Sequence, residues 1–495
     1  MSDTPVTNIP VKRRIERFCI RSALAAALLT QAVQPVWAND QPLPTFGGLG
    51  GGIISDQLEV EIGQQVLSSL RRSAPQIQDP LTADYAQTLV HRLLPSVPLN
   101  DKHLTLIMID SPDLNAFAVP GNIVGVNGGL FLSSDSEQQF ASVLAHELAH
   151  LSQRHFARRL EQQENTAPMA LAGMIAGIVL SAVTKSDIGV AAIAGTQALS
   201  IQNMLQYSRA HEQEADRIGL QIMADADLDP RGMPAMFEQM MKQNRLQGSH
   251  VPEYLSTHPL TQSRVSDTRS RAEQYPSREV PDSLEYHLIR ARMQAHYAET
   301  PSTGTEHFKR LQRHPDGARN PAVGYGLAVA YLSNDQPELA VAELQTLLNK
   351  HPGRITFQVT LAEALLRMEH RQDANTLMRE ALKRNPDNYP ITEMLARTEL
   401  DTGNTAAAVA ALKKLTRQFP EREHLWLRLV EAEGQARNIV GVHQAQAEYE
   451  LLMGDLSAAR RQLLQAQERV APGTPAHQAI TERLNSVASA LSRRQ

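Results

Sequence analysis

Two histidines lie four residues apart in the stretch VLAHELAHLSQRH, residues 143–155, and a glutamate directly follows the first of them. On a helix, residues four apart share a face, so the imidazoles of His146 and His150 can reach one metal ion. Glu147 lies beside them and can take a proton from metal-bound water without being a ligand. The spacing predicts a zinc-dependent hydrolytic site, although a pattern this short also occurs by chance.

A further ligand is expected from SRAHEQEADRIG, residues 208–219. Glu212 and Asp216 are four apart on a predicted helix, so one carboxylate can bind metal while the other accepts a hydrogen bond from a ligating histidine. Glu214 is the competing ligand, but no acidic residue follows it four positions later. We therefore predict one zinc ion per chain, with His146, His150 and Glu212 as ligands and with Glu147 and Asp216 as catalytic residues.

The surrounding sequence predicts the elements that position these side chains. LTLIMID, residues 104–110, is typical of a strand, and residues 115–131 have a hairpin signal around Pro120-Gly121-Asn122. The edge strand near residues 116–119 would hold an extended peptide by backbone pairing. Ser134-x-x-Glu137 then predicts a capping box that starts the motif helix. The histidine motif is thus expected on a helix next to a small sheet.

The first 38 residues have the pattern of a cleaved signal peptide. A basic stretch at 12–17 precedes an apolar run at 22–33 and a small-residue cleavage site at 36–38. An uncleaved anchor helix is the alternative, but the apolar run is shorter than the ~20 residues that span a bilayer. The single cysteine, Cys19, lies in this segment, so only histidine and carboxylate remain as metal ligands. The pattern predicts a periplasmic protein.

Length and charge limit the remaining possibilities. A chain of 495 residues predicts more than one domain, and a net charge of −5 with scattered basic residues makes nucleic acid an unexpected partner. Residues 168–202 are strongly apolar but are interrupted at 185–187, so each half is shorter than a membrane span. A packed helical hairpin is the expected structure here. Peripheral membrane contact, or an integral membrane protease, is the alternative.

A 34-residue period begins after residue 283. Pro352, Pro386 and Pro420 each close a helical stretch, and small residues recur at two fixed positions of the period. The small residues are Ala328, Ala362 and Ala396 at one position, and Ala340, Ala374 and Ala408 at the other. This is the tetratricopeptide pattern, in which small side chains let paired helices approach closely. We predict a mainly α (α+β) chain: a zincin-like metallopeptidase domain with a small β-sheet at 39–282, followed by a tetratricopeptide superhelix at 283–495.

HELAH followed by SRAHEQEADRIG, with NAFAVPGNIVGVNGGLF ahead of both, resembles the HtpX/Ste24-type zinc metallopeptidase family. The resemblance implies the same three zinc ligands and the same base that the spacing predicts. It also implies a fourth ligand, His258, in the loop STHPLTQSR at 256–264. A histidine at the fourth position displaces the catalytic water, so the enzyme would stay latent until this lid moves.

A signal peptide in front and repeats behind resemble the periplasmic members of that family. This implies an endopeptidase that helps outer-membrane proteins mature and degrades misassembled forms. The implied partners are unfolded or misassembled outer-membrane proteins, the β-barrel assembly machinery and the lipopolysaccharide-insertion barrel. The alternative is a repeat-built chaperone or scaffold with a rarely active metal site. Glu147 argues against it, because a structural zinc needs no base.

Other polar residues carry weaker signals. His155 comes five residues after His150, which on a continuous helix points it away from the metal face, so a surface position is expected. His211 or Tyr254 could donate a hydrogen bond to the developing oxyanion. Arg209 could pair with Asp216 or a neighbouring acid.

Overall fold

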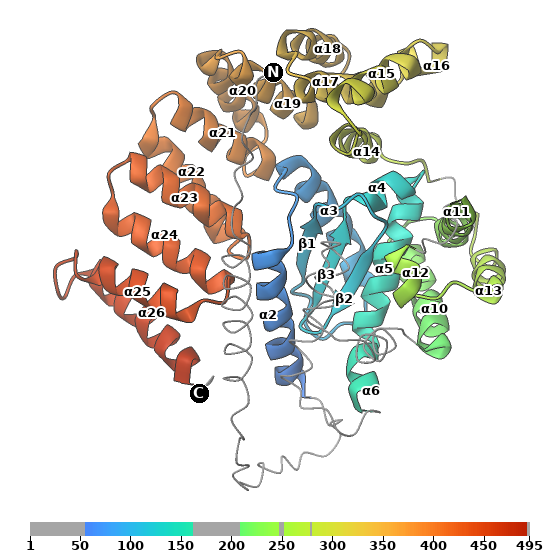
Figure 1. The fold of residues 1–495 in the computed structure, drawn as a ribbon, viewed down its shortest axis with the longest axis horizontal. Coiled ribbons are helices and arrows are strands. Elements are labelled where there is room, and N and C mark those ends of the chain that lie inside the picture. The colour runs from blue at the N-terminus through green and yellow to red at the C-terminus, as the bar shows by residue number, and fades with distance from the viewer. Residues whose placement is uncertain (1–54, 162–207, 247–251, 278–279, 493–495) are drawn as a thin grey trace, which may run out of the picture. The chain divides into compact units, whose positions relative to one another are not determined.

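The computed structural model describes residues 55–161, 208–246, 252–277 and 280–492. These residues are mainly helical and contain one small sheet (Figure 1), which confirms the predicted fold class. The predicted signal peptide and the apolar segment 168–202 lie outside the described residues. Within the described ranges, no helix combines the length and the apolar character that crossing a membrane requires.

The sheet has three strands: β1 (Thr105–Ile109), β2 (Ala116–Val119) and β3 (Ile123–Asn127). Their order is β1-β3-β2, with β1 parallel and β2 antiparallel to β3, so the predicted strand and hairpin are confirmed. Gly121 and Asn122 form the hairpin turn with φ of 79° and 56°, a conformation that glycine and asparagine tolerate best. Strand β2 lies at an edge of the sheet.

The motif helix α5 packs on one side against β2 and on the other against α10 and α11 (Figure 1). The helices of this part of the chain are α2 (Asp56–Ser73), α3 (Pro80–Leu93), η1 (Leu94–Ser96), α4 (Gly129–Ser133), α5 (Glu137–Ser152), α6 (His155–Glu161), α10 (Arg209–Asp225), α11 (Gly232–Leu246), α12 (Glu253–Thr257) and α13 (Gln262–Ala272). Because α5 is enclosed on several sides, both its apolar and its polar faces are buried.

The start of α5 differs from the prediction. Ser136 is the N-cap, and its hydroxyl accepts a hydrogen bond from the Gln139 amide at 3.2 Å. The predicted capping box at Ser134 is wrong, because the Ser134 hydroxyl donates instead to the Leu130 carbonyl at 2.8 Å and ends α4. Glu137 is thereby free to make contacts outside its own helix.

The apolar face of α5 joins an aromatic cluster. The rings of Phe131 and Phe140 stack with centroids 4.3 Å apart, and Tyr85 and Tyr286 lie against both. Val143, Leu144 and Leu148 continue the buried stripe along the helix. A fully buried side chain of this size stabilises the fold by about 1.5–3 kcal/mol. This face therefore fixes how α5 is rotated about its axis.

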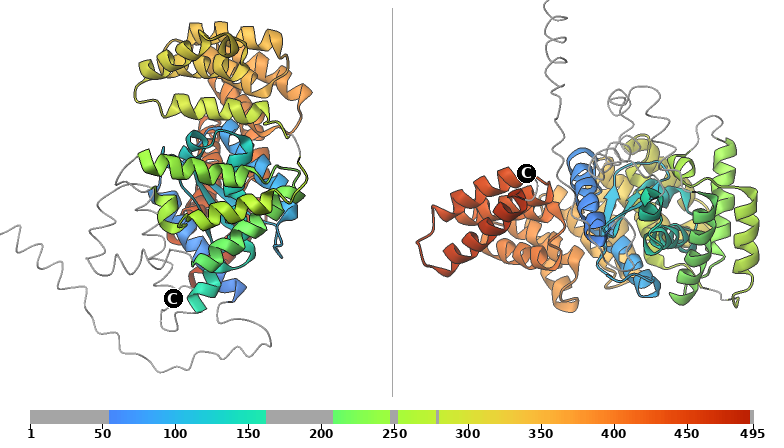
Figure 2. Two further views of the ribbon diagram at one scale, coloured as in Figure 1. Left: turned by 90° about the vertical axis from the view of Figure 1, so that its right-hand side faces the viewer. Right: turned by 90° about the horizontal axis from the view of Figure 1, so that it is seen from below.

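The repeat region confirms the 34-residue pattern. Its helices are α14 (Leu284–His296), α15 (Pro301–Gln312), α16 (Pro315–Arg319), α17 (Pro321–Ser333), α18 (Pro337–Lys350), α19 (Ile355–Arg367), α20 (Arg371–Arg384), α21 (Tyr389–Asp401), α22 (Thr405–Gln418), α23 (Glu423–Gln435), α24 (Ile439–Leu452), α25 (Leu456–Gln467) and α26 (Pro475–Ser492). Pro352, Pro386 and Pro420 follow the ends of α18, α20 and α22, and the six periodic alanines are all buried. Successive helices lie side by side (Figure 2).

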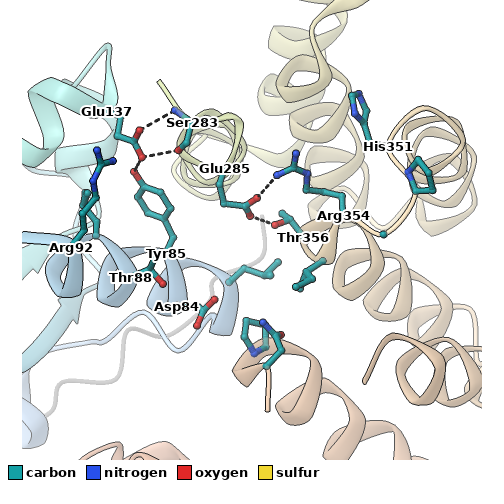
Figure 3. Close-up of a pocket in the computed structure, with 17 residues that line it drawn as sticks. Asp84, Tyr85, Thr88, Arg92, Glu137, Ser283, Glu285, His351, Arg354 and Thr356 are labelled. Atoms are coloured by element: carbon teal, nitrogen blue, oxygen red, sulfur yellow. Dashed lines mark hydrogen bonds and ion pairs between the residues drawn. The ribbon is translucent and has the colours of Figure 1, made fainter. Parts of the chain in front are cut away.

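Glu137 fastens the start of α5 to the start of α14 (Figure 3). Its carboxylate accepts hydrogen bonds from the Tyr85 hydroxyl at 2.7 Å and from the backbone amide and hydroxyl of Ser283 at 2.9 and 2.7 Å. The Glu137 amide in turn donates to Asp282 at 3.0 Å. A cavity of about 720 Å³ lies beside this junction, lined by α3, the first residues of α14, the loop 351–354 and the start of α19.

We expect Glu137→Ala to lower the free energy of unfolding by roughly 2–4 kcal/mol, because the substitution leaves the buried Tyr85 hydroxyl and two partly buried donors of Ser283 without their acceptor. The measurement is chemical denaturation in the presence of a chelator, which removes any contribution from bound metal. Glu338→Ala is the matched control, since Glu338 is an exposed glutamate in the first turn of α18. Equal stability of the two variants would contradict the role of Glu137.

Candidate metal centre

His146, His150, Glu212 and His258 converge in the interior of the structure. One ligand atom from each lies within 4.8 Å of the others, and all four side chains are buried. The Nε2 atoms of His146 and His150 face each other at 3.0 Å. The structure thus brings together all four residues that the sequence predicted as ligands, from α5, α10 and the end of α12.

A close crossing of α5 and α10 makes this convergence possible. Gly219 on α10 lies so near α5 that an added Cβ would be 3.4 Å from the His146 amide nitrogen and 2.8 Å from the Met233 methyl carbon. Glycine therefore lets the two helix backbones approach, which a larger residue would prevent without a shift of Met233. Ser208 caps α10 by accepting from the His211 amide at 3.2 Å and sets Glu212 in its first turn.

Two buried glutamates flank the histidine pair. The Glu212 oxygens lie 3.6 Å from His146 Nε2 and 3.4 Å from His150 Nε2, and one of them lies 3.0 Å from His258 Nδ1. Glu147 is completely buried, yet neither of its oxygens accepts a hydrogen bond from the residues that the structure describes. Nε2 of His258 lies 3.6 Å from one of the Glu147 oxygens. An unsatisfied buried carboxylate is costly and indicates a functional site.

Arg264 is a component of the site that the sequence analysis missed. Its guanidinium binds both Asp216 oxygens at 2.7 Å and also contacts Glu212 at 2.5 Å. Asp216 in turn lies 3.1 Å from His146 Nδ1, at hydrogen-bonding distance but away from the ideal angle. The signal was available, since two acids predicted on one buried helix face require a nearby cation. Arg209, the expected partner of Asp216, is exposed.

The surface position expected for His155 is wrong, because α5 does not continue to this residue. Helix α5 ends at Ser152, Arg154 adopts a positive φ of 49°, and a separate helix, α6, starts at His155. The turn buries the His155 side chain completely and places its Nδ1 2.9 Å from His150 Nδ1. Its Nε2 lies 3.0 Å from Glu214, the carboxylate that was the alternative ligand.

Tyr254 and His211, the two candidates for an oxyanion donor, lie against different histidines. Tyr254 is buried, and its ring stacks on His258 with centroids 4.7 Å apart, so it lies at the site. His211 stacks on His155 at 4.5 Å, on the side of the site that carries Glu214. Tyr254 therefore remains a candidate on position, whereas His211 faces a different neighbour.

Burial and neighbouring charges shift the pKa values of the residues in this cluster. Burial alone would lower the pKa of His146, but the adjacent carboxylates of Asp216 and Glu212 raise it to about 9. Burial tends to raise the pKa of Glu212, but the nearby His258 and Arg264 lower it well below its usual range. Burial lowers the pKa of His150 well below 6.5, which keeps this ring neutral, the form in which imidazole binds metal.

These residues fit a divalent cation. Two imidazoles and a carboxylate are a common set of ligands for zinc in hydrolytic enzymes. Glu147, Glu212 and Asp216 are three buried acids, and the buried guanidinium of Arg264 contacts Glu212 and Asp216. When the two motif histidines are neutral, as metal binding requires, the acids carry more negative charge than Arg264 compensates. One divalent cation neutralises that excess.

Comparison with known proteins agrees with this geometry. The model of peptidase family M48 matches residues 80–272, and models of the tetratricopeptide repeat match residues 322–353 and 365–432. The chain is 32% identical to the putative beta-barrel assembly-enhancing protease of Vibrio cholerae, over 91% of this chain and 99% of that protein. It is 31% identical to the beta-barrel assembly-enhancing protease of Escherichia coli K12, over 93% and 94% of the two chains.

Another relative matches a smaller share of the chain. The mitochondrial metalloendopeptidase OMA1 of Bos taurus is 33% identical over 35% of this chain and 34% of its own length. The near-complete coverage of the bacterial relatives, together with the buried histidine and glutamate cluster, leads to one assignment. The chain belongs to peptidase family M48 and is a metalloendopeptidase that carries tetratricopeptide repeats.

Proposed function

We propose that His146, His150 and Glu212 hold one zinc ion and that Glu147 is the catalytic base. The observation that carries this proposal is the convergence of the three donors beside a buried glutamate whose oxygens have no hydrogen-bond partner among the described residues. Bound zinc would supply Lewis-acid polarisation of the peptide carbonyl and acidify a water molecule. Asp216 would orient His146, and Arg264 would hold Asp216 in place.

Glu147 would move the proton of the reaction. It would take a proton from the attacking water and deliver it to the nitrogen of the leaving amine, which breaks the peptide bond. The burial of Glu147 strengthens its interactions with nearby charges, since little solvent screens them.

Strand β2 would bind the substrate backbone. It pairs with β3 along one edge, and it lies next to α5, which carries the base. An extended peptide that adds a strand at such an edge gains main-chain hydrogen bonds with little dependence on its sequence. This mode suits unfolded segments as substrates.

His258 would act as a lid that keeps the enzyme latent. Its ring lies within reach of the other three ligands and contacts both Glu212 and Glu147. A histidine in this place excludes the water that the reaction needs. The ring sits at the end of the five-residue helix α12 and stacks on Tyr254 of that same helix, so a local movement of α12 would withdraw both.

The repeats would select the clients. Relatives over nearly the whole chain are named for assembly of β-barrels, so we infer that this chain acts on unfolded or misassembled outer-membrane proteins and degrades the failed ones. The proposed partners are the β-barrel assembly machinery and the lipopolysaccharide-insertion barrel. The proposed organisation is a signal peptide at 1–38, a peptidase domain at 39–282 and a repeat domain at 283–495, working in the periplasm.

We expect the purified chain to contain close to one zinc ion and to lose cleavage of casein when a chelator removes it. Elemental analysis by mass spectrometry measures the metal, and zinc should restore cleavage. The two-histidine, one-carboxylate set also occurs in iron enzymes, so the analysis distinguishes the metals. Undiminished cleavage by metal-free protein would contradict the proposal.

Glu147→Gln should bind zinc as the starting protein does but cleave casein about 10²–10⁴-fold more slowly, because the amide cannot accept the proton. Zinc content and initial rates are compared for both proteins. Glu338→Gln, at an exposed position on α18, is the control for a general effect of removing a carboxylate. Equal rates for Glu147→Gln and the starting protein would reject Glu147 as the base.

His258→Ala should cleave casein faster than the starting protein, because the rate of a latent enzyme is limited by the small fraction with the lid open. The increase should disappear in the double variant His258→Ala, Glu147→Gln, which shows that the activity comes from this site. A rate that is unchanged or lower in His258→Ala would contradict latency and would favour a different role for the ring.

A further inference from the structure

The two histidines of the motif are oriented by different partners. Asp216 lies directly against Nδ1 of His146. The Nδ1 of His150 instead faces the Nδ1 of His155 at 2.9 Å. Metal-binding histidines usually donate their second ring proton to a carboxylate, a carbonyl or water. An imidazole is not one of these usual partners, so the position of His155 against His150 requires an explanation.

The protonation of these rings follows from hydrogen-bond counting. His150 can offer the Nε2 lone pair to an ion only if its proton is on Nδ1, and that proton then points at His155. Nδ1 of His155 must therefore accept, and in a neutral ring the His155 proton must be on Nε2. That nitrogen lies 3.0 Å from the Glu214 carboxylate, which can only accept when ionised. The chain of donors has one direction, from His150 through His155 to Glu214.

The surroundings hold this chain in place. His155 is fully buried, and its ring stacks on His211 with an interplanar angle of 15°. Glu214, at 28% side-chain exposure, is also held by Arg158 at 3.0 Å. The Glu214 carboxylate therefore lies towards solvent, whereas the His155 ring that it orients lies against His150.

We propose that His155, anchored by Glu214, is a positioning residue that holds His150 in the tautomer and orientation that present Nε2 to the metal. The inference rests on the proposed zinc site. It gives a function to His155, the last residue of the stretch VLAHELAHLSQRH, which lies outside the five-residue motif.

The test is zinc affinity of the full chain by competition with a chelator, together with casein cleavage at saturating zinc. His155→Phe keeps a planar ring but cannot accept the His150 proton, and it should weaken zinc binding about 10- to 100-fold. His155→Gln retains an acceptor oxygen and should bind zinc more tightly than His155→Phe. Glu214→Ala should weaken binding in the same direction, and it serves if the His155 variants do not fold.

His296→Phe is the matched control, because His296 also pairs with a carboxylate, Asp110 at 2.8 Å, away from the metal centre. It should leave zinc affinity unchanged. Tight zinc binding by the starting protein with equal affinity in His155→Phe and Glu214→Ala would overturn the positioning role. Equal weakening in His155→Phe and His155→Gln would also overturn it, since a role in packing alone gives that result. No zinc binding by the starting protein would instead reject the metal site itself.

Discussion

The burial of ionised groups where α5 crosses α10 is the constraint on which the rest of this structure depends. Three acids and one guanidinium lie out of water there, and a buried charge without a partner is strongly destabilising. Arg264 compensates part of the negative charge by binding Asp216 and contacting Glu212. The negative charge that Arg264 does not compensate favours the binding of a cation between the histidines. The same buried acids that destabilise the crossing of α5 and α10 without an ion would attract a cation to it.

The constraint also explains the construction around the crossing. Aromatic packing fixes the rotation of α5, and Gly219 fixes how closely α10 approaches. Glu137 ties the first residue of α5 to the start of the repeat helices. A movement of the repeat region at Ser283 would therefore displace the first residues of the helix that carries Glu147, the proposed base. The other end of α5, which carries His146 and His150, is instead fixed by side chains, through Asp216 and His155.

Much of this could be predicted from the sequence, because the relevant signals are periodic. Positions four apart on a helix placed His146 with His150, and the 34-residue spacing placed the alanines that are buried between repeat helices. The failures are local interruptions of a period or partners distant in sequence. His155 was misplaced because the break at Arg154 gave no glycine or proline signal, and Arg264 was missed because its acids lie 48 and 52 residues earlier. The cap at Ser134 failed because a second helix competed for the same hydroxyl.

The most direct test of the account is the zinc X-ray absorption spectrum of the purified, zinc-loaded chain. The account predicts a shell of nitrogen and oxygen ligands at about 2.0–2.1 Å, with the multiple scattering that imidazole rings produce and with no sulfur. An ion held only by water, without imidazole scattering, would contradict it. That result would mean that the buried histidines and acids are compensated within the protein rather than by a metal.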